Sequence, residues 1–154
     1  MKKWYPLFPL ALSLVLGTAR AAPALLVRDA WIPEAPPVAR VQAGYMALSN
    51  EGASPVTIVG ANSAEFDAVE MHRTVEIEGA MRMEAQPALR IEPGTTLKLA
   101  PGGLHLMLIG PKRPLVAGDC VGIDLRLEGG SVILATAEVR QAQAGGEHAH
   151  HHHH

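Results

Sequence analysis

The chain has 154 residues, of which 48% are hydrophobic and only 4% aromatic, and its formal charge at pH 7 is −2. This length fits one domain with a hydrophobic core of its own. Because the chain has no excess of positive charge and few aromatic rings, we expect no nucleic acid partner. The single cysteine, Cys120, excludes a disulfide within the chain.

The N-terminal residues read as a secretory signal peptide covering residues 1–21. Lys2 and Lys3 supply the positive charge, residues 7–16 form a short apolar run, and Ala19 and Ala21 provide the small-x-small cleavage pattern. The run is too short to span a bilayer comfortably, and no cysteine lies near the predicted cleavage site, so we expect no lipoprotein anchor. The sequence thus predicts a soluble periplasmic protein with a domain at 22–141 and a tail at 142–154.

The mature region predicts an all-β fold. Short apolar or alternating runs are separated by Gly, Pro and Asn, and no long helical pattern is present. The predicted strands cover residues 25–32, 41–49, 55–63, 68–75, 81–84, 89–91, 95–99, 105–109, 120–127 and 131–139. Many short strands at close spacing indicate a β-sandwich or a small Greek-key barrel.

The strands at 68–75 and 81–84 carry the first pair of candidate metal ligands, His72 and Met83. A loop over residues 76–79 would place these two residues opposite each other, with Cβ atoms roughly 5 Å apart. A different loop would break this pairing. Met81 alternates onto the same face as Met83, which makes it a candidate transient ligand.

The second pair, His105 and Met107, lies in the predicted strand at 105–109. Alternation sends Leu104, Leu106 and Leu108 toward the core and the histidine and methionine to the opposite face. Taken singly, a strand methionine is usually a flexible filler, and a lone histidine is usually a hydrogen-bonded polar group. The combination of imidazole and thioether favours copper, and thioether favours Cu(I).

Cys120 raises the alternative of an electron-transfer copper site, which needs two histidines and a cysteine with a weak methionine. No histidine follows Cys120 before the tail, so we expect a buried structural thiol instead. The sequence shows no catalytic triad, phosphate-binding loop or paired carboxylates, and we expect no enzymatic activity.

The C-terminal tail is rich in histidine and has two interpretations. It is either an expression tag or a native segment that binds Cu(II), which imidazole suits. The candidate accessory ligands are His148, His150, His151, His152, His153 and His154.

Several stretches together resemble the periplasmic copper chaperone family called PCuAC, whose motif is H(M)-x10-M-x21-H-x-M. Ten residues separate His72 from Met83, twenty-one separate Met83 from His105, and one separates His105 from Met107. Arg73 stands where the optional methionine would follow the first histidine. The resemblance extends over residues 27–139 and rests on the stretches DAW (29–31), GYM (44–46), MHRT (71–74), GAMRM (79–83) and PGGLHLML (101–108).

This resemblance implies a cupredoxin-like β-sandwich that binds one Cu(I) through His72, Met83, His105 and Met107. It also implies delivery of copper to the dinuclear centre of cytochrome c oxidase subunit II, directly or through another assembly chaperone, by a protein that we expect to be a monomer. Three alternatives stay open: copper sequestration or resistance, electron transfer, and a metal-free interaction module.

Overall fold

A computed structural model describes Met1 and residues 25–141. Residues 2–21 of the signal peptide predicted at 1–21, the first residues of the predicted domain (22–24) and the histidine tail therefore lie outside the described residues. Within these residues, no helix has the length and hydropathy of a membrane span. Residues 25–141 form ten strands: β1 (Leu25–Pro33), β2 (Val41–Asn50), β3 (Val56–Asn62), β4 (Phe66–Ile77), β5 (Ala80–Ala85), β6 (Leu89–Ile91), β7 (Thr96–Leu99), β8 (Leu104–Pro111), β9 (Cys120–Leu127) and β10 (Val132–Arg140).

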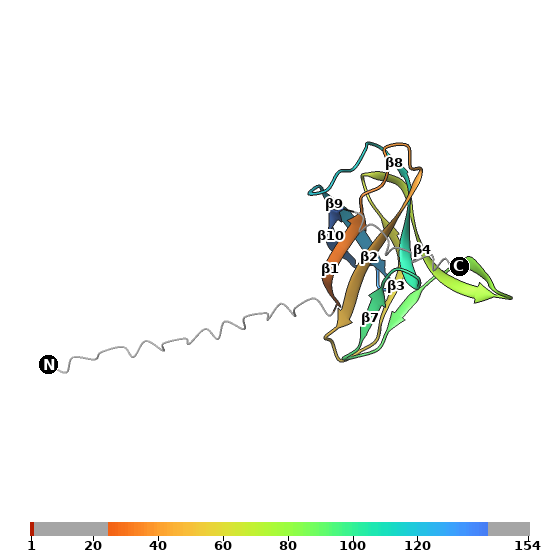
Figure 1. Ribbon diagram of the computed structural model, residues 1–154. Coiled ribbons are helices and arrows are strands. Elements are labelled where there is room, and N and C mark those ends of the chain that lie inside the picture. The colour runs from red at the N-terminus through yellow and green to blue at the C-terminus, as the bar shows by residue number, and fades with distance from the viewer. Residues whose placement is uncertain (2–24, 142–154) are drawn as a thin grey trace, which may run out of the picture.

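The strands close into a mixed barrel, visible in Figure 1. The order β4-β8-β2-β1-β10-β9-β3 returns to its start because β3 also pairs with β4, where Ala61 faces Val69. β1 and β10 are parallel and the other neighbours are antiparallel. β5, β6 and β7 attach to β4, β3 and β2 outside this circuit. The all-β barrel expected from the sequence is confirmed, with each of its ten strands within two residues of the predicted bounds.

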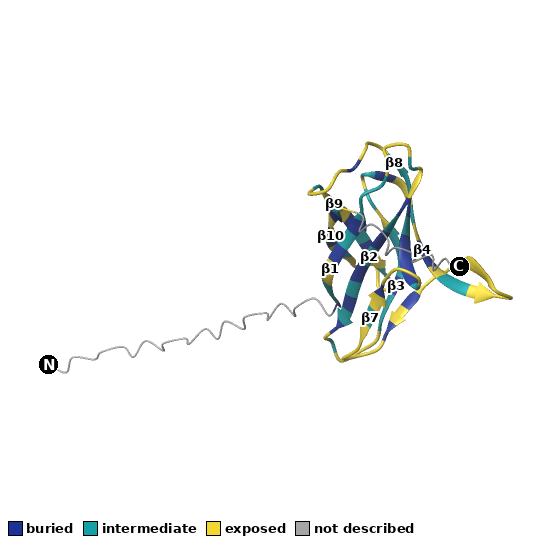
Figure 2. Cartoon of the chain, viewed as in Figure 1, coloured by how far each residue is buried: buried dark blue, intermediate teal, exposed yellow. Residues whose placement is uncertain are grey.

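The barrel is filled by alternate side chains, as the dark blue positions along the strands in Figure 2 show. On β8 the relative exposures of Leu104, Leu106 and Leu108 are 8%, 1% and 0%. Full burial of one leucine side chain stabilises a fold by about 1.5–3 kcal/mol. The leucine face of β8 is therefore a wall of the core, as alternation predicted.

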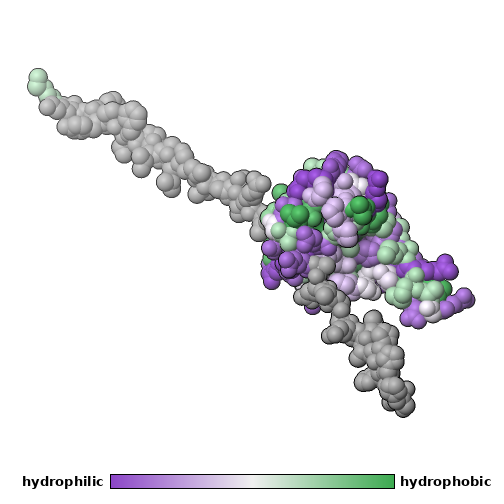
Figure 3. Space-filling view, turned by 45° about the horizontal axis from the view of Figure 1, so that its top comes forward, coloured by the Kyte–Doolittle hydropathy of each residue, from purple (hydrophilic) through white to green (hydrophobic). Residues whose placement is uncertain are grey.

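β4 and β5 extend beyond the barrel as a hairpin, which we call the arm (Figure 1). The arm turns at Glu78 and Gly79, whose φ angles are 52° and 77°. Two central residues with positive φ are the mark of the tight type I′ turn. Every residue of β5 is exposed, and in Figure 3 this projection carries hydrophilic and hydrophobic residues side by side.

The tight turn corrects one sequence prediction. We expected a loop at 76–79 that would set His72 opposite Met83, but His72 faces Ala85, and Met83 faces Thr74. The turn uses only two residues because Glu78 accepts a left-handed conformation that the pattern did not reveal. The shift moves the partners by two positions, so Met83 stays on the same face of the sheet as His72.

A second correction concerns Cys120, which we expected to be buried and which is exposed. It begins β9, where Val121 and Ile123 point into the core with relative exposures of 0% each. Alternation therefore puts Cys120 on the outer face, together with Gly122.

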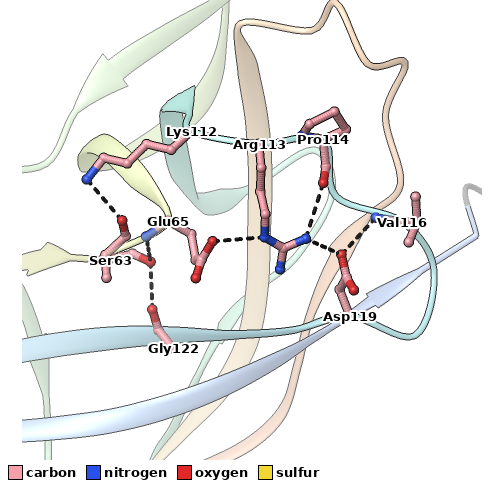
Figure 4. A network of polar contacts seen from close by, with 9 residues as sticks. Ser63, Glu65, Lys112, Arg113, Pro114, Val116, Asp119 and Gly122 are labelled. Atoms are coloured by element: carbon pink, nitrogen blue, oxygen red, sulfur yellow. Dashed lines mark hydrogen bonds and ion pairs between the residues drawn. The ribbon is translucent and has the colours of Figure 1, made fainter.

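The loop between β8 and β9 is held by a network of polar contacts, shown in Figure 4. Arg113 donates to Glu65 at 3.2 Å and to Asp119 at 2.7 Å, and the Ser63 hydroxyl donates to the Gly122 carbonyl at 2.6 Å. The Arg113–Glu65 contact joins the loop to the β3–β4 turn, and the Ser63–Gly122 contact joins the same turn to β9. They lie at the end of β8 opposite to His105, so they brace the barrel away from the candidate metal ligands.

Candidate metal centre

His72 and His105 form the centre of the predicted ligand set. They are directly opposed residues of β4 and β8, and their ring centroids are 6.1 Å apart. Both lie on the outer face of the sheet, because their chain neighbours Met71 and Leu106 belong to the buried core. Their relative exposures are nevertheless only 9% and 7%. The two imidazoles are thus side by side, shielded from solvent and separate from the leucine core.

Met107 joins this pair from β8. It lies two residues beyond His105 on the same face, which corresponds to roughly 7 Å along the strand. It faces Glu70 of β4 on one side and Ala43 of β2 on the other, and it is half-buried. The long thioether side chain can span the distance to the imidazoles.

Met83 reaches the same face from the arm. Its partner Thr74 lies two residues from His72, so Met83 is a diagonal neighbour of His72, at about 7–8 Å between backbones. Met83 and Met81 each have a relative exposure of 63%. The structure therefore gathers all four predicted residues on one outer face, three of them on the barrel strands β4 and β8 and Met83 on the exposed strand β5.

Each imidazole has one ring nitrogen held by an oxygen acceptor. Nδ1 of His105 lies 3.1 Å from the carbonyl oxygen of Gly103, and Nε2 of His72 lies 2.8 Å from a carboxylate oxygen of Glu70. Because both oxygens accept, these ring nitrogens donate. The lone pairs are then left on Nε2 of His105 and Nδ1 of His72, as nitrogen ligands to a metal require.

Nδ1 of His72 is the more informative of these atoms. It is buried and has no hydrogen-bond partner among the described residues. Buried polar atoms without partners are rare and costly in native proteins. A soft metal ion bound by two imidazoles and two thioethers would satisfy this nitrogen, so the residues present fit copper.

Glu70 is the member of this site that the sequence reasoning missed. It lies two residues before His72, on the same face, and opposite Met107. The signal was available in the sequence, because alternation along β4 puts the carboxylate of a Glu-x-His triplet beside the imidazole. The sequence prediction covers only the residue types that bind copper, whereas Glu70 contacts a candidate ligand and is not one itself.

An aromatic pair occupies the same outer face on β1 and β2. The rings of Trp31 and Tyr45 are 4.8 Å apart, and the Arg140 guanidinium lies 5.8 Å from the centre of a Trp31 ring. Partial burial raises the pKa of the Tyr45 phenol above its usual value. This phenol stays protonated at neutral pH and adds no charge near Met107.

Sequence comparison identifies relatives of this chain. The family described as LpqE-like ("Putative lipoprotein LpqE-like") matches residues 25–139. A protein of Leifsonia xyli subsp. xyli named "Putative lipoprotein Lxx21020" is 35% identical over 129 residues, which cover 83% of this chain and 76% of the relative. Both names contain the word lipoprotein; the single cysteine of the present chain is Cys120, which lies within β9 and far from the predicted cleavage site.

Solved structures agree with this assignment. A copper-bound PCuAC domain from PmoF2 superposes with a TM-score of 0.65 over 79% of this chain and 97% of that domain, at 21% identity, and shows the shared fold. The Cu(I) form of DR1885 from Deinococcus radiodurans is 31% identical, with a TM-score of 0.57 over 80% of this chain and 82% of that protein. The chain therefore belongs to the LpqE-like family and has the PCuAC fold that the sequence resemblance implied.

Proposed function

We propose that this protein binds one Cu(I) through His72, His105, Met107 and Met83 and passes it to an acceptor protein. The observation that carries this proposal is the shared outer face on which two opposed imidazoles, with free lone pairs on one nitrogen each, lie beside two thioethers. The solved Cu(I) form of DR1885, a relative at 31% identity, supports the same cargo.

The donor set selects the oxidation state. Thioether sulfur is a soft ligand that stabilises Cu(I), and imidazole accepts either oxidation state. In an oxidising compartment thiols form disulfides or higher oxidation products, whereas a carrier built on methionine keeps its ligands. This chemistry is consistent with export to the periplasm, which we propose as the location of the protein.

The uneven exposure of the ligands suggests how copper leaves. His72 and His105 are buried, whereas Met83 is largely exposed on a strand that, within residues 25–141, has β4 as its single neighbour. A ligand of the acceptor can replace Met83 first, while the other three residues still hold the ion. Transfer is then an exchange of ligands in which no substrate bond is made or broken, so the role is that of a carrier and not of an enzyme.

A Cu(I) competition titration tests the binding step. The protein used has its six tail histidines replaced by alanine, so that only the barrel contributes. We expect the parent to bind one equivalent of Cu(I) tightly. His105→Ala should weaken Cu(I) binding more than about 100-fold, because losing a ligand should cost more affinity than losing a contact outside the ligand set. Equal affinities of the parent and the variant would reject the site.

The acceptor that we propose is the dinuclear centre of cytochrome c oxidase subunit II, reached directly or through another assembly chaperone. Deleting the gene tests delivery against sequestration. Delivery predicts lost oxidase activity when copper is limiting. Sequestration instead predicts normal oxidase activity and sensitivity to excess copper.

A further inference from the structure

We infer that Glu70 is a positioning residue that fixes the tautomer of His72, so that His72 receives copper through Nδ1 and not through Nε2. This inference rests on the proposed function, because it specifies which atom of one proposed ligand meets the ion. It adds to the four-residue motif a fifth residue that does not bind the metal.

The first support is the contact itself. A carboxylate oxygen of Glu70 lies 2.8 Å from Nε2 of His72. An ionised carboxylate only accepts hydrogen bonds, so Nε2 carries the hydrogen in this contact. The Glu70 side chain is 51% exposed and the His72 side chain is 11% exposed, so solvent reaches the carboxylate from one side and the imidazole is held in place on the other.

The second support comes from the tautomer that is excluded. If the hydrogen were on Nδ1, the lone pair of Nε2 would face the lone pairs of the carboxylate. The buried N–H at Nδ1 would also lack an acceptor, since this atom has no partner among the described residues. Because Nδ1 has no partner among the described residues in either tautomer, the contact of Nε2 with Glu70 decides between them, and the facing lone pairs disfavour a hydrogen on Nδ1. Glu70 therefore leaves the lone pair on Nδ1 for the metal.

His105 shows that the two histidines are held by different means. Its Nδ1 donates to the backbone carbonyl of Gly103, which leaves Nε2 free. The proposed site therefore uses Nδ1 of one imidazole and Nε2 of the other. Only the His72 tautomer depends on a side chain, so only this half can be changed by substitution of the acceptor.

The position of Glu70 excludes a simpler role as a copper ligand. It faces Met107 on the neighbouring strand, but carboxylate oxygen is a hard donor that suits Mg²⁺ or Ca²⁺ better than Cu(I). Carboxylates that accept the second N–H of a metal-binding histidine are a common arrangement, and their loss typically costs about 10–100-fold in metal affinity.

The test reads the His72 tautomer directly by long-range ¹H–¹⁵N correlation spectra of the full chain with its tail histidines replaced, first without copper and then with one equivalent of Cu(I). We expect His72 to carry its hydrogen on Nε2 in both states. In Glu70→Ala we expect a mixture of tautomers without copper and Cu(I) binding weakened by about 10–100-fold. Glu70→Gln retains a carbonyl acceptor and should keep nearly the parent tautomer and affinity.

Glu76→Gln and Glu76→Ala are the matched controls. Glu76 is an exposed glutamate on the same strand and the same face, four residues beyond His72 and opposite Met81. These variants remove the same charge without touching the imidazole, and both should resemble the parent. If Glu70→Ala and Glu76→Ala weaken binding equally, the effect is one of charge and the inference fails.

Two further results would also overturn the inference: a hydrogen on Nδ1 of His72 without copper, or copper bound at Nε2 in the loaded protein. Failure of the proposed function looks different. The parent protein would then bind no Cu(I), while its copper-free spectra would still decide whether Glu70 sets the tautomer. Thermal melts verify that each variant is folded.

Discussion

β8 and β5 each supply part of the proposed site, yet they differ in nearly every physical respect. β8 lies between β2 and β4, and its leucines form a wall of the core. Among the strands of the described part of the chain, β5 pairs only with β4, and all six of its residues are exposed. The comparison shows that one strand, β8, places ligands rigidly, whereas another strand, β5, leaves a ligand accessible to a partner protein. The packing of the β8 leucines fixes the positions of His105 and Met107, whereas the Met83 side chain is exposed and accessible to a partner protein.

The consequence is that substitutions in the two strands should separate stability from binding. Changes on the core face of β8 should unfold the protein, because close-packed interiors relax only partly around a cavity. Changes on β5 should leave the barrel intact and act only on metal binding or transfer.

Leu106→Ala tests the wall and should have the largest effect on stability. Leu106 is 1% exposed, and truncation of a buried leucine typically lowers the free energy of unfolding by about 2–5 kcal/mol. Urea unfolding followed by circular dichroism measures this loss. A loss near that of an exposed residue would mean that β8 is not the rigid half of the site, and the comparison with β5 would fail.

Met83→Ala tests the arm. Because Met83 is 63% exposed, its truncation should change the free energy of unfolding by no more than about 0.5 kcal/mol. Loss of a thioether ligand should weaken Cu(I) binding by at least about tenfold, which corresponds to about 1.4 kcal/mol. Competition titration and urea unfolding of the same sample measure both quantities.

Met81→Ala is the matched control for this substitution, because Met81 has the same exposure and lies on the same face. It should retain the parent affinity at equilibrium. An unfolding loss larger than the binding loss in Met83→Ala would assign Met83 to packing and remove it from the ligand set.

Gly79→Ala tests whether the arm can loosen without the barrel. Gly79 has a φ of +77° and open space around its α-carbon, so alanine would meet backbone strain of about 1 kcal/mol and no steric clash. Amide hydrogen exchange should become faster along β5 and stay unchanged along β8. Faster exchange in both strands would show that the arm and the wall form one cooperative unit.

The sequence predicted the wall better than the arm, for a physical reason. Alternation is a property of each strand by itself, so the faces of His105, Met107 and the β8 leucines could be read directly. The pairing of β4 with β5 depends on the turn, and Glu78 in a left-handed conformation has no strong signature in the sequence. The face of Met83 was right even though its partner was wrong, because the register moved by an even number of residues.

Two other misses have simpler causes. The exposure of Cys120 follows from the alternation of Val121 and Ile123 and was obscured by the general tendency of cysteine to be buried. Glu70 was missed because the search was restricted to residue types that bind copper. That His72 and His105 are buried on the outer side of the sheet could not be predicted, since it depends on how neighbouring segments cover that face.

Asp119→Asn tests the polar network at the far end of β8 and should have the smallest effect. The Arg113 hydrogen bond, followed by that from the Val116 backbone, holds the pKa of Asp119 below its usual value of about 3.9. Its contribution to stability is therefore present above about pH 4 and is lost as the pH falls through the lowered pKa of the folded protein. Thermal melts should show a small deficit of the variant at pH 7 that disappears toward pH 2. Exposed ion pairs usually contribute little to stability. A loss of thermal stability as large as that of Leu106→Ala would therefore contradict the comparison of β8 with β5, because the leucine wall would then not be the main source of rigidity behind His105.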